Sequence, residues 1–235
     1  MKKLFLSPFF SIFFTIVCMA LYYGLSYVFR LKYGVFDIEE LGITDTLTTL
    51  FYGMAFGVVI CLYKDFTTIS EKRTYGALLF LWFFTLLREW GLQHWLAVND
   101  TTAIKINYFK NAAVPLYAKV IAGCVIIGVC VVIGYLLFKH LKQMIIGFFK
   151  MVPMYWTIAT FGALGVMTQL TDRFPALYRK STGQMISESI KFPLKILEEG
   201  GESILPLLFA VAFVQYHLCK KTCQSADEST TTVQD

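Results

Sequence analysis

Six runs of mostly apolar residues follow one another along the chain, separated by segments that hold most of its Lys, Arg, Asp and Glu residues. A helix needs about 20 mostly apolar residues to cross the hydrocarbon core of a bilayer. Each run has about this length. The pattern therefore predicts an all-α, polytopic membrane protein, a bundle of six transmembrane helices over residues 8–29, 46–63, 75–98, 117–138, 151–171 and 197–218.

The six predicted spans form one membrane domain over residues 1–223, followed by a short polar tail. The tail, residues 224–235, is rich in Ser, Thr and acidic residues. Such a composition cannot bury enough apolar surface to offset the entropy of ordering, so we expect the tail to be disordered.

The longest link between two predicted spans covers residues 172–196. Pro175 and Pro193 are expected to interrupt helices there, because proline cannot donate the helical hydrogen bond. Between them, residues 183–191 have the alternation of a short surface helix, and Ser187 is a candidate N-cap.

Composition supports the membrane assignment and excludes the soluble classes. Of the 235 residues, 57% are hydrophobic and only 16% are charged, whereas soluble domains carry about 25% charged residues. A chain of this size cannot hide so much apolar surface inside one water-exposed globule.

The charge balance indicates membrane lipids, and no nucleic acid, as partners. Lys and Arg number 21 against 16 Asp and Glu, a net charge of +5, and no basic cluster with interleaved aromatic residues is present. Lys2, Lys3 and the short basic loops favour both termini in the cytoplasm. The expected location is a plasma membrane of the bacterial inner-membrane type.

The third predicted span contains an unusual group of polar residues, Arg88, Glu89, Gln93 and His94. At 1.5 Å per residue, Glu89 lies roughly 13 Å below the end of this span, inside the hydrocarbon. Charged side chains at that depth are costly and are a default sign of function. His94 lies about 140° around the helix from Glu89, so a site that uses both must be completed from other helices.

The sixth predicted span opens with Glu198, Glu199, Gly200, Gly201 and Glu202. The first and last of these glutamates are four residues apart and lie on one side of a helix, where like charges repel each other. Such a cluster calls for a cation, a metal ion or a proton. The two glycines would let another helix pack closely or would loosen the start of the helix.

Span order predicts that most intramembrane polar residues lie toward one membrane face. Spans two and six begin at that face and spans three and five end there, while the opposite halves of these helices are almost purely apolar. This one-sided polarity predicts an outward-facing cavity whose candidate residues are Asp45, Arg88, Glu89, Gln93, His94, Gln169, Asp172, Arg173, Glu198, Glu199 and Glu202.

The first functional hypothesis is that this cavity binds a cation or a polar lipid headgroup and belongs to a carrier of ions, protons or a small polar solute. Intramembrane acids beside an arginine are typical of ion and proton relays. The candidate residues for holding a substrate or headgroup are Arg88, Gln93, Arg173, Glu198 and Glu199.

The second hypothesis is a metal-dependent intramembrane enzyme that acts on a lipid or lipid-linked substrate. His94, Glu89, Asp172 and Glu202 would hold a divalent metal as cofactor, with Glu89, His94 and Glu202 as the catalytic groups. Against it, the sequence has no HExxH, GxSxG or DxxD motif and no second histidine on that face.

The third hypothesis is a non-catalytic scaffold, a homo-oligomer or a subunit of a membrane complex. Arg88 and Glu89 would then form a structural ion pair, and the polar face would meet a partner. The sequence leaves the three hypotheses open.

Overall fold

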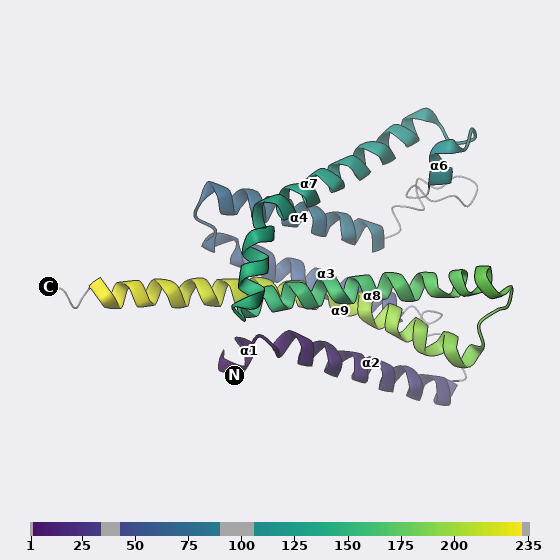
Figure 1. Cartoon of the computed structure of the whole chain (residues 1–235), viewed down its shortest axis with the longest axis horizontal. Coiled ribbons are helices and arrows are strands. Elements are labelled where there is room, and N and C mark those ends of the chain that lie inside the picture. Colours follow the sequence, from purple (N-terminus) through teal and green to yellow (C-terminus); the bar gives the residue numbers. More distant parts are fainter. Residues whose placement is uncertain (1, 34–42, 90–105, 232–235) are drawn as a thin grey trace. The chain divides into compact units, whose positions relative to one another are not determined.

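The computed structural model describes residues 2–33, 43–89 and 106–231, and all regular structure in these ranges is helical (Figure 1). In chain order the elements are α1 (Lys2–Phe5), α2 (Phe10–Tyr33), α3 (Ile43–Cys61), the short 3-10 turn η2 (Leu62–Asp65), α4 (Ile69–Glu89), α6 (Ile106–Lys110), α7 (Leu116–Phe149), α8 (Pro153–Thr182) and α9 (Glu188–Thr231).

Four of these helices are long and apolar enough to cross a membrane by length and composition, which indicates an integral membrane protein. The four candidate spans are Phe10–Lys32, Thr46–Lys64, Leu116–Phe149 and Glu188–Lys220, on predicted spans one, two, four and six.

The other two predicted spans coincide with helices that do not reach that criterion. The described part of α4 ends at Glu89 and includes the charged turn around Lys72; the rest of this predicted span, up to Val98, lies outside the described residues. Helix α8 contains several Thr residues and Gln169 in its apolar part, and Asp172 and Arg173 follow within the same continuous helix.

Large apolar side chains point outward along the candidate spans. On α2, the exposed fractions of Phe13, Ile16 and Leu21 are 66%, 61% and 62%, and Phe138 on α7 is 95% exposed. Continuous apolar surface of this extent is unfavourable in water at about 25 cal/mol per Å². Contact with lipid tails removes that cost.

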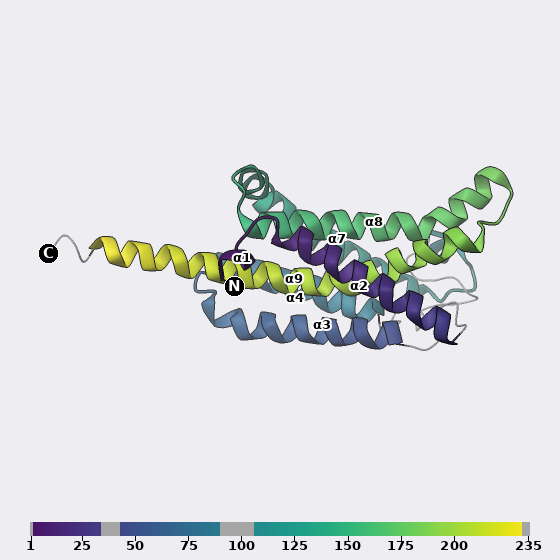
Figure 2. The ribbon, with the colours of Figure 1, turned by 90° about the horizontal axis from the view of Figure 1, so that it is seen from below.

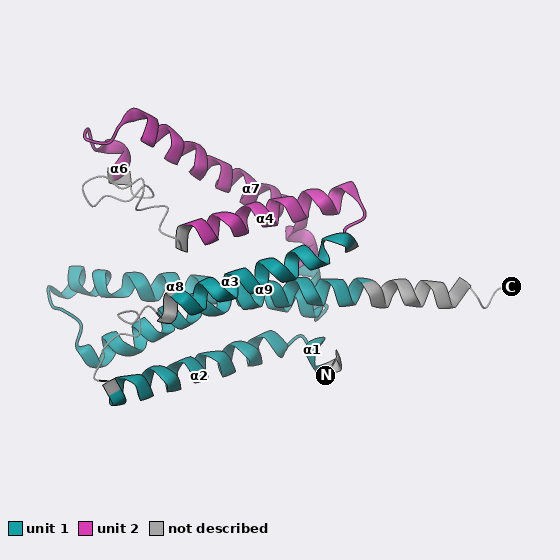
Figure 3. Ribbon diagram, turned by 180° about the vertical axis from the view of Figure 1, so that it is seen from behind, with its two compact units in different colours: residues 1–65, 145–235 teal, residues 66–144 magenta. Residues whose placement is uncertain are grey.

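The helices fall into two compact units, coloured separately in Figure 3. Unit 1 consists of Met1–Asp65 and Ile145–Asp235, and unit 2 of Phe66–Met144.

Helix α9 is the central helix of unit 1 and packs against α2, α3 and α8 (Figure 2). Of the residues in the most apolar stretch of α9, 33% are buried inside the protein, whereas the same fraction for α2 is 6%. Helix α9 is therefore enclosed by its neighbours, and α2 is peripheral. The core of unit 1 contains Leu164 of α8 and Ile204 and Leu208 of α9, and Phe14 and Met19 of α2 pack against it.

Unit 2 has a smaller core between α6 and α7, formed by Tyr108, Val114, Ala118 and Ala122. Small residues on α7 allow α6 to approach closely here, as is usual in membrane helix packing.

The predicted link over residues 172–196 is much shorter in the structure. Helix α8 continues to Thr182 and α9 begins at Glu188. Gly183 ends α8 in the left-handed conformation, with φ 71°, and its N–H donates to the carbonyl four residues earlier at 2.9 Å. Ser187, the candidate N-cap, directly precedes α9. The short surface helix predicted over residues 183–191 is not present, because residues 183–187 are not helical and α9 begins at Glu188.

Pro175 and Pro193 lie inside α8 and α9, so the prediction that they interrupt helices is wrong. A proline removes one helical hydrogen bond and bends the helix, but tertiary packing can hold the turn. Phe192 and Ile196, on either side of Pro193, are both buried.

Helix α9 continues to Thr231. Its helical bounds therefore include residues 224–231, part of the segment for which composition predicts disorder.

Candidate functional site

Specific contacts fix the direction in which each helix of unit 1 runs beside α9. In the second half of α9, the Thr157 hydroxyl of α8 donates to Gln215 Oε1 at 2.6 Å, and Gln215 Nε2 donates to the Phe5 carbonyl at 3.0 Å. Near its beginning, the Arg30 guanidinium of α2 lies 4.4 Å from the centre of the Phe192 ring. Helices α2 and α8 are therefore antiparallel to α9.

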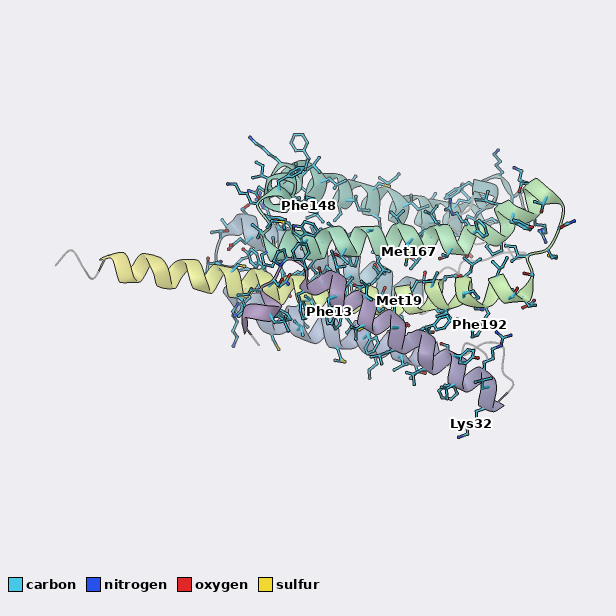
Figure 4. All side chains as sticks on the ribbon, turned by 60° about the horizontal axis from the view of Figure 1, so that its bottom comes forward. Phe13, Met19, Lys32, Phe148, Met167 and Phe192 are labelled. Carbon is cyan, nitrogen blue, oxygen red and sulfur yellow. The ribbon has the colours of Figure 1, made fainter. Side chains whose placement is uncertain are left out.

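The carboxyl-terminal halves of α2 and α8 consequently lie beside the amino-terminal half of α9. In Figure 4, Phe192 and Lys32 lie toward this end of unit 1, and Phe148 lies toward the other. Helix α3 starts here too, because Thr48 and Ser203 bring their hydroxyl oxygens to 2.7 Å. We call this end of unit 1, which contains residue 202 of α9, the Glu202 end.

Two adjacent glycines allow α2 and α8 to approach α9 closely at this end. A Cβ on Gly200 would lie 2.8 Å from Tyr22 Cδ1 and 3.3 Å from Met19 Sδ, both on α2. A Cβ on Gly201 would collide with Thr168 Cγ2 of α8. The sequence prediction that these glycines permit close helix packing is confirmed.

Three glutamates surround this glycine pair on α9. Glu198, Glu199 and Glu202 are all half-buried, and each takes part in interactions within the protein. Glu202 lies between Gly201 and Ser203, which are both buried. It is therefore placed where α9 is enclosed by its neighbours.

Glu202 lies farther along α9 than the contact between α9 and the Arg30 guanidinium. Ten residues separate it from Phe192, the ring that Arg30 covers, which corresponds to about 15 Å along a helix. At its own level, the neighbours contributed by α2, α3 and α8 are Met19, Tyr22, Thr48 and Thr168. These side chains are apolar or carry hydroxyl groups, so α2, α3 and α8 place hydroxyl groups at this depth.

A further polar contact between helices in unit 1 joins two neutral hydroxyl groups. Ser11 of α2 and Thr160 of α8 lie 3.2 Å apart, in addition to the Thr48–Ser203 and Thr157–Gln215 pairs. The buried polar residues of the described chain are Ser, Thr and Gln, with no Asp, Glu, Lys, Arg or His among them. Among the described residues of unit 1, no charged side chain is fully buried. Glu198, Glu199 and Glu202 are half-buried.

The structure brings only part of the predicted site together. Asp172 and Arg173 are exposed on α8. The contact between Thr168 and Gly201, extended one turn along antiparallel helices, puts Asp172 near the level of Glu198.

The polar residues of the third predicted span are placed less completely. Arg88 and Glu89 are the last two residues of α4, in unit 2, and their side chains are outside the described part. Gln93 and His94 lie wholly outside the described residues. Within the described residues, no three His, Cys, Asp or Glu side chains lie close enough together to hold a metal ion. The four-residue metal set therefore stays a prediction.

Sequence reasoning missed the polar contacts made by Gln215, Thr157, Thr48 and Ser203. A signal was present for Gln215, an amide within a long apolar run. Its partners could not be found in the same way, because they depend on how the helices are rotated and aligned.

No protein-family model, curated protein or solved structure matches this chain. The function must therefore be argued from the site alone.

Proposed function

We propose that this integral membrane protein binds a cation at Glu202 and serves as a carrier, loaded from the Glu202 end of unit 1. The observation that supports the proposal best is the position of Glu202. It is a half-buried acid one residue after the close contact between Gly201 and Thr168.

The energetic argument starts from the cost of an acid inside a membrane helix. That cost is about 2.5–3.5 kcal/mol on insertion scales. Glu198 lies four residues before Glu202, close enough for the two carboxylates to repel each other. A bound cation or proton lowers both costs together.

The surrounding chemistry suits a small cation or the amine of a lipid headgroup. Carboxylate and hydroxyl oxygens are hard ligands, which favour protons and hard metal ions. Arg173 and Arg30, which lie farther from the centre of unit 1 than Glu202, would favour the phosphate of a headgroup.

The decisive measurement is the thermal stability of the full chain in detergent, titrated with Na⁺, K⁺, Mg²⁺, Ca²⁺ or Mn²⁺ and with protons. A ligand that binds the folded state stabilises it by about 2.7 kcal/mol at one hundred times its Kd. We expect stabilisation by at least one of these cations in the wild type and none in Glu202→Gln.

The matched control is Glu188→Gln, which changes an exposed acid at the start of the same helix. Glu188 pairs with Lys191 at 3.7 Å, and we expect its substitution to leave the cation response unchanged. If wild type and Glu202→Gln respond identically to every cation and to pH, the proposal is wrong.

Carrier activity is tested separately in sealed proteoliposomes. The stabilising cation should cross into vesicles that contain wild type, read by an indicator trapped inside, and not into vesicles that contain Glu202→Gln. If the cation binds to the protein but does not enter the vesicles, the cation site is supported and the carrier function is contradicted.

A further inference from the structure

Helix α7 is longer than a membrane crossing requires. It contains 34 residues, or about 51 Å at 1.5 Å per residue, against a hydrocarbon core of about 30 Å. Its apolar run ends at Phe138, and Lys139, His140, Lys142 and Gln143 follow directly. The end of α7 therefore extends out of the hydrocarbon as a helix.

Basic side chains collect at this end of α7, within unit 2. Lys139 Nζ donates to the Ser70 carbonyl at 2.9 Å and to the Thr74 hydroxyl at 2.8 Å. His140 Nε2 lies 3.1 Å from the same Thr74 hydroxyl. These bonds bind the beginning of α4 to α7. They place the two helices' cationic residues at one end of the unit.

Helix α4 contributes two exposed cations to this end, Lys72 and Arg73. The acid beside them, Glu71, is engaged in capping: its Oε2 accepts from the backbone N–H groups of Thr67 and Thr68 at 3.1 and 3.2 Å. We call Lys72, Arg73, Lys139 and Lys142 the basic end of unit 2. Its charge is positive, with four cations and one acid used locally.

The same stretch of α7 also carries an apolar side. Leu141, three residues past the end of the apolar run, has an exposed fraction of 47%. It lies about 160° around the helix from Lys139 and 100° from Lys142. A helical turn with basic groups on one side and an exposed apolar group on the other is suited to the boundary between headgroups and acyl chains.

We propose that the basic end of unit 2 binds anionic lipid headgroups at the membrane surface. Charge complementarity identifies this occupant: each Lys or Arg near an anionic leaflet gains about 1 kcal/mol. Position identifies it too, because the cations directly follow the membrane-crossing part of α7. This inference is independent of the proposed cation site, which lies in unit 1.

The test measures lipid selectivity of the full chain in proteoliposomes. Spin-labelled phosphatidylglycerol or phosphatidylcholine is added, and the share of each that is immobilised next to the protein is read from the electron paramagnetic resonance spectrum. We expect wild type to immobilise phosphatidylglycerol preferentially. The preference should weaken as salt is raised, since added ions screen exposed charges.

The informative variant is the pair Lys72→Gln with Lys142→Gln, both exposed. Its preference should fall roughly fivefold per lysine removed, the factor that corresponds to about 1 kcal/mol. The matched control is Lys110→Gln with Lys119→Gln, which removes the same charge from the opposite end of the α6–α7 region of unit 2.

Three results would overturn the proposal: no preference in wild type, a preference that persists in Lys72→Gln with Lys142→Gln, or an equal loss in the control pair. Far-ultraviolet circular dichroism of each protein in the same vesicles establishes that the compared proteins have the same helix content.

Discussion

At the scale of single residues, Gln215 shows how a polar side chain is accommodated inside an apolar bundle. Its side chain is fully buried. Its Oε1 accepts from the Thr157 hydroxyl, and its Nε2 donates to the Phe5 carbonyl. One amide therefore connects α8, α9 and the N-terminal helix α1. Since a buried polar group without partners is costly, these bonds favour one alignment of the three helices.

This alignment can be tested by a double-mutant cycle on Gln215→Leu and Thr157→Val. Each single substitution should destabilise the protein by about 1 kcal/mol, because it leaves the other group without its present partner. The coupling between them should be about 0.6 kcal/mol, the average for hydrogen bonds between membrane helices. Unfolding in mixed micelles of increasing SDS content measures both quantities.

The control for this cycle is Thr171→Val, also on α8. The Thr171 hydroxyl bonds to carbonyls of its own helix, at 3.0 and 2.8 Å. Its coupling to Gln215→Leu should be zero. A coupling as large as that of Thr157→Val would contradict the assigned contact.

At the scale of helices, the Gly200–Gly201 pair sets how closely α2 and α8 approach α9. Gly201→Ala should destabilise the protein by about 1–3 kcal/mol, because the added methyl group would collide with Thr168 Cγ2. Thr168 cannot turn away freely, since its hydroxyl donates to the Gly165 carbonyl at 3.0 Å. The measurement is again unfolding in mixed micelles.

Gly162→Ala on α8 is the matched control, because a Cβ there meets nothing within 4 Å. Alanine favours helix over glycine by about 1 kcal/mol, so this change should be neutral or stabilising. If both substitutions had the same effect, the close contact at Gly201 would be wrong.

The helices also show which features a sequence pattern can predict. Over the residues that the structure describes, every apolar run coincides with a helix, because burial of apolar groups in lipid governs both. The helix ends were predicted less well. Hydropathy marks where a helix leaves the hydrocarbon, while α8 ends only where Gly183 supplies the left-handed turn. Pro193 likewise lies inside α9, between the buried residues Phe192 and Ile196.

The candidate site was predictable in its local part only. The acids and glycines of residues 198–202 share one helix, so their spacing already implied repulsion and close packing. The pairing of Thr48 with Ser203 depends on the rotation and alignment of two helices far apart in the sequence. A one-dimensional pattern contains neither quantity.

At the scale of the whole molecule, the number of membrane crossings follows from how α8 pairs with α9. Contacts at Thr157–Gln215 and Thr168–Gly201 lie at separate levels of the two helices, so α8 runs beside α9 over several turns. If α9 crosses the membrane, α8 crosses it in the opposite direction. We therefore expect six crossings, with α4 as the return from α3 to α7, although composition alone identifies four.

Single cysteines distinguish six crossings from four. They are introduced at Thr67, Asn111, Lys150 and Gln184, in a chain whose six native cysteines are replaced by alanine, and labelled with an impermeant maleimide in intact vesicles. Six crossings put positions 67 and 150 on one side and 111 and 184 on the other. Four crossings, by α2, α3, α7 and α9, would instead group 67 with 111 and 150 with 184. The positive-inside rule adds that positions 67 and 150 should both face the cytoplasm together with both termini. Labelling of both positions from the outer side would contradict this orientation.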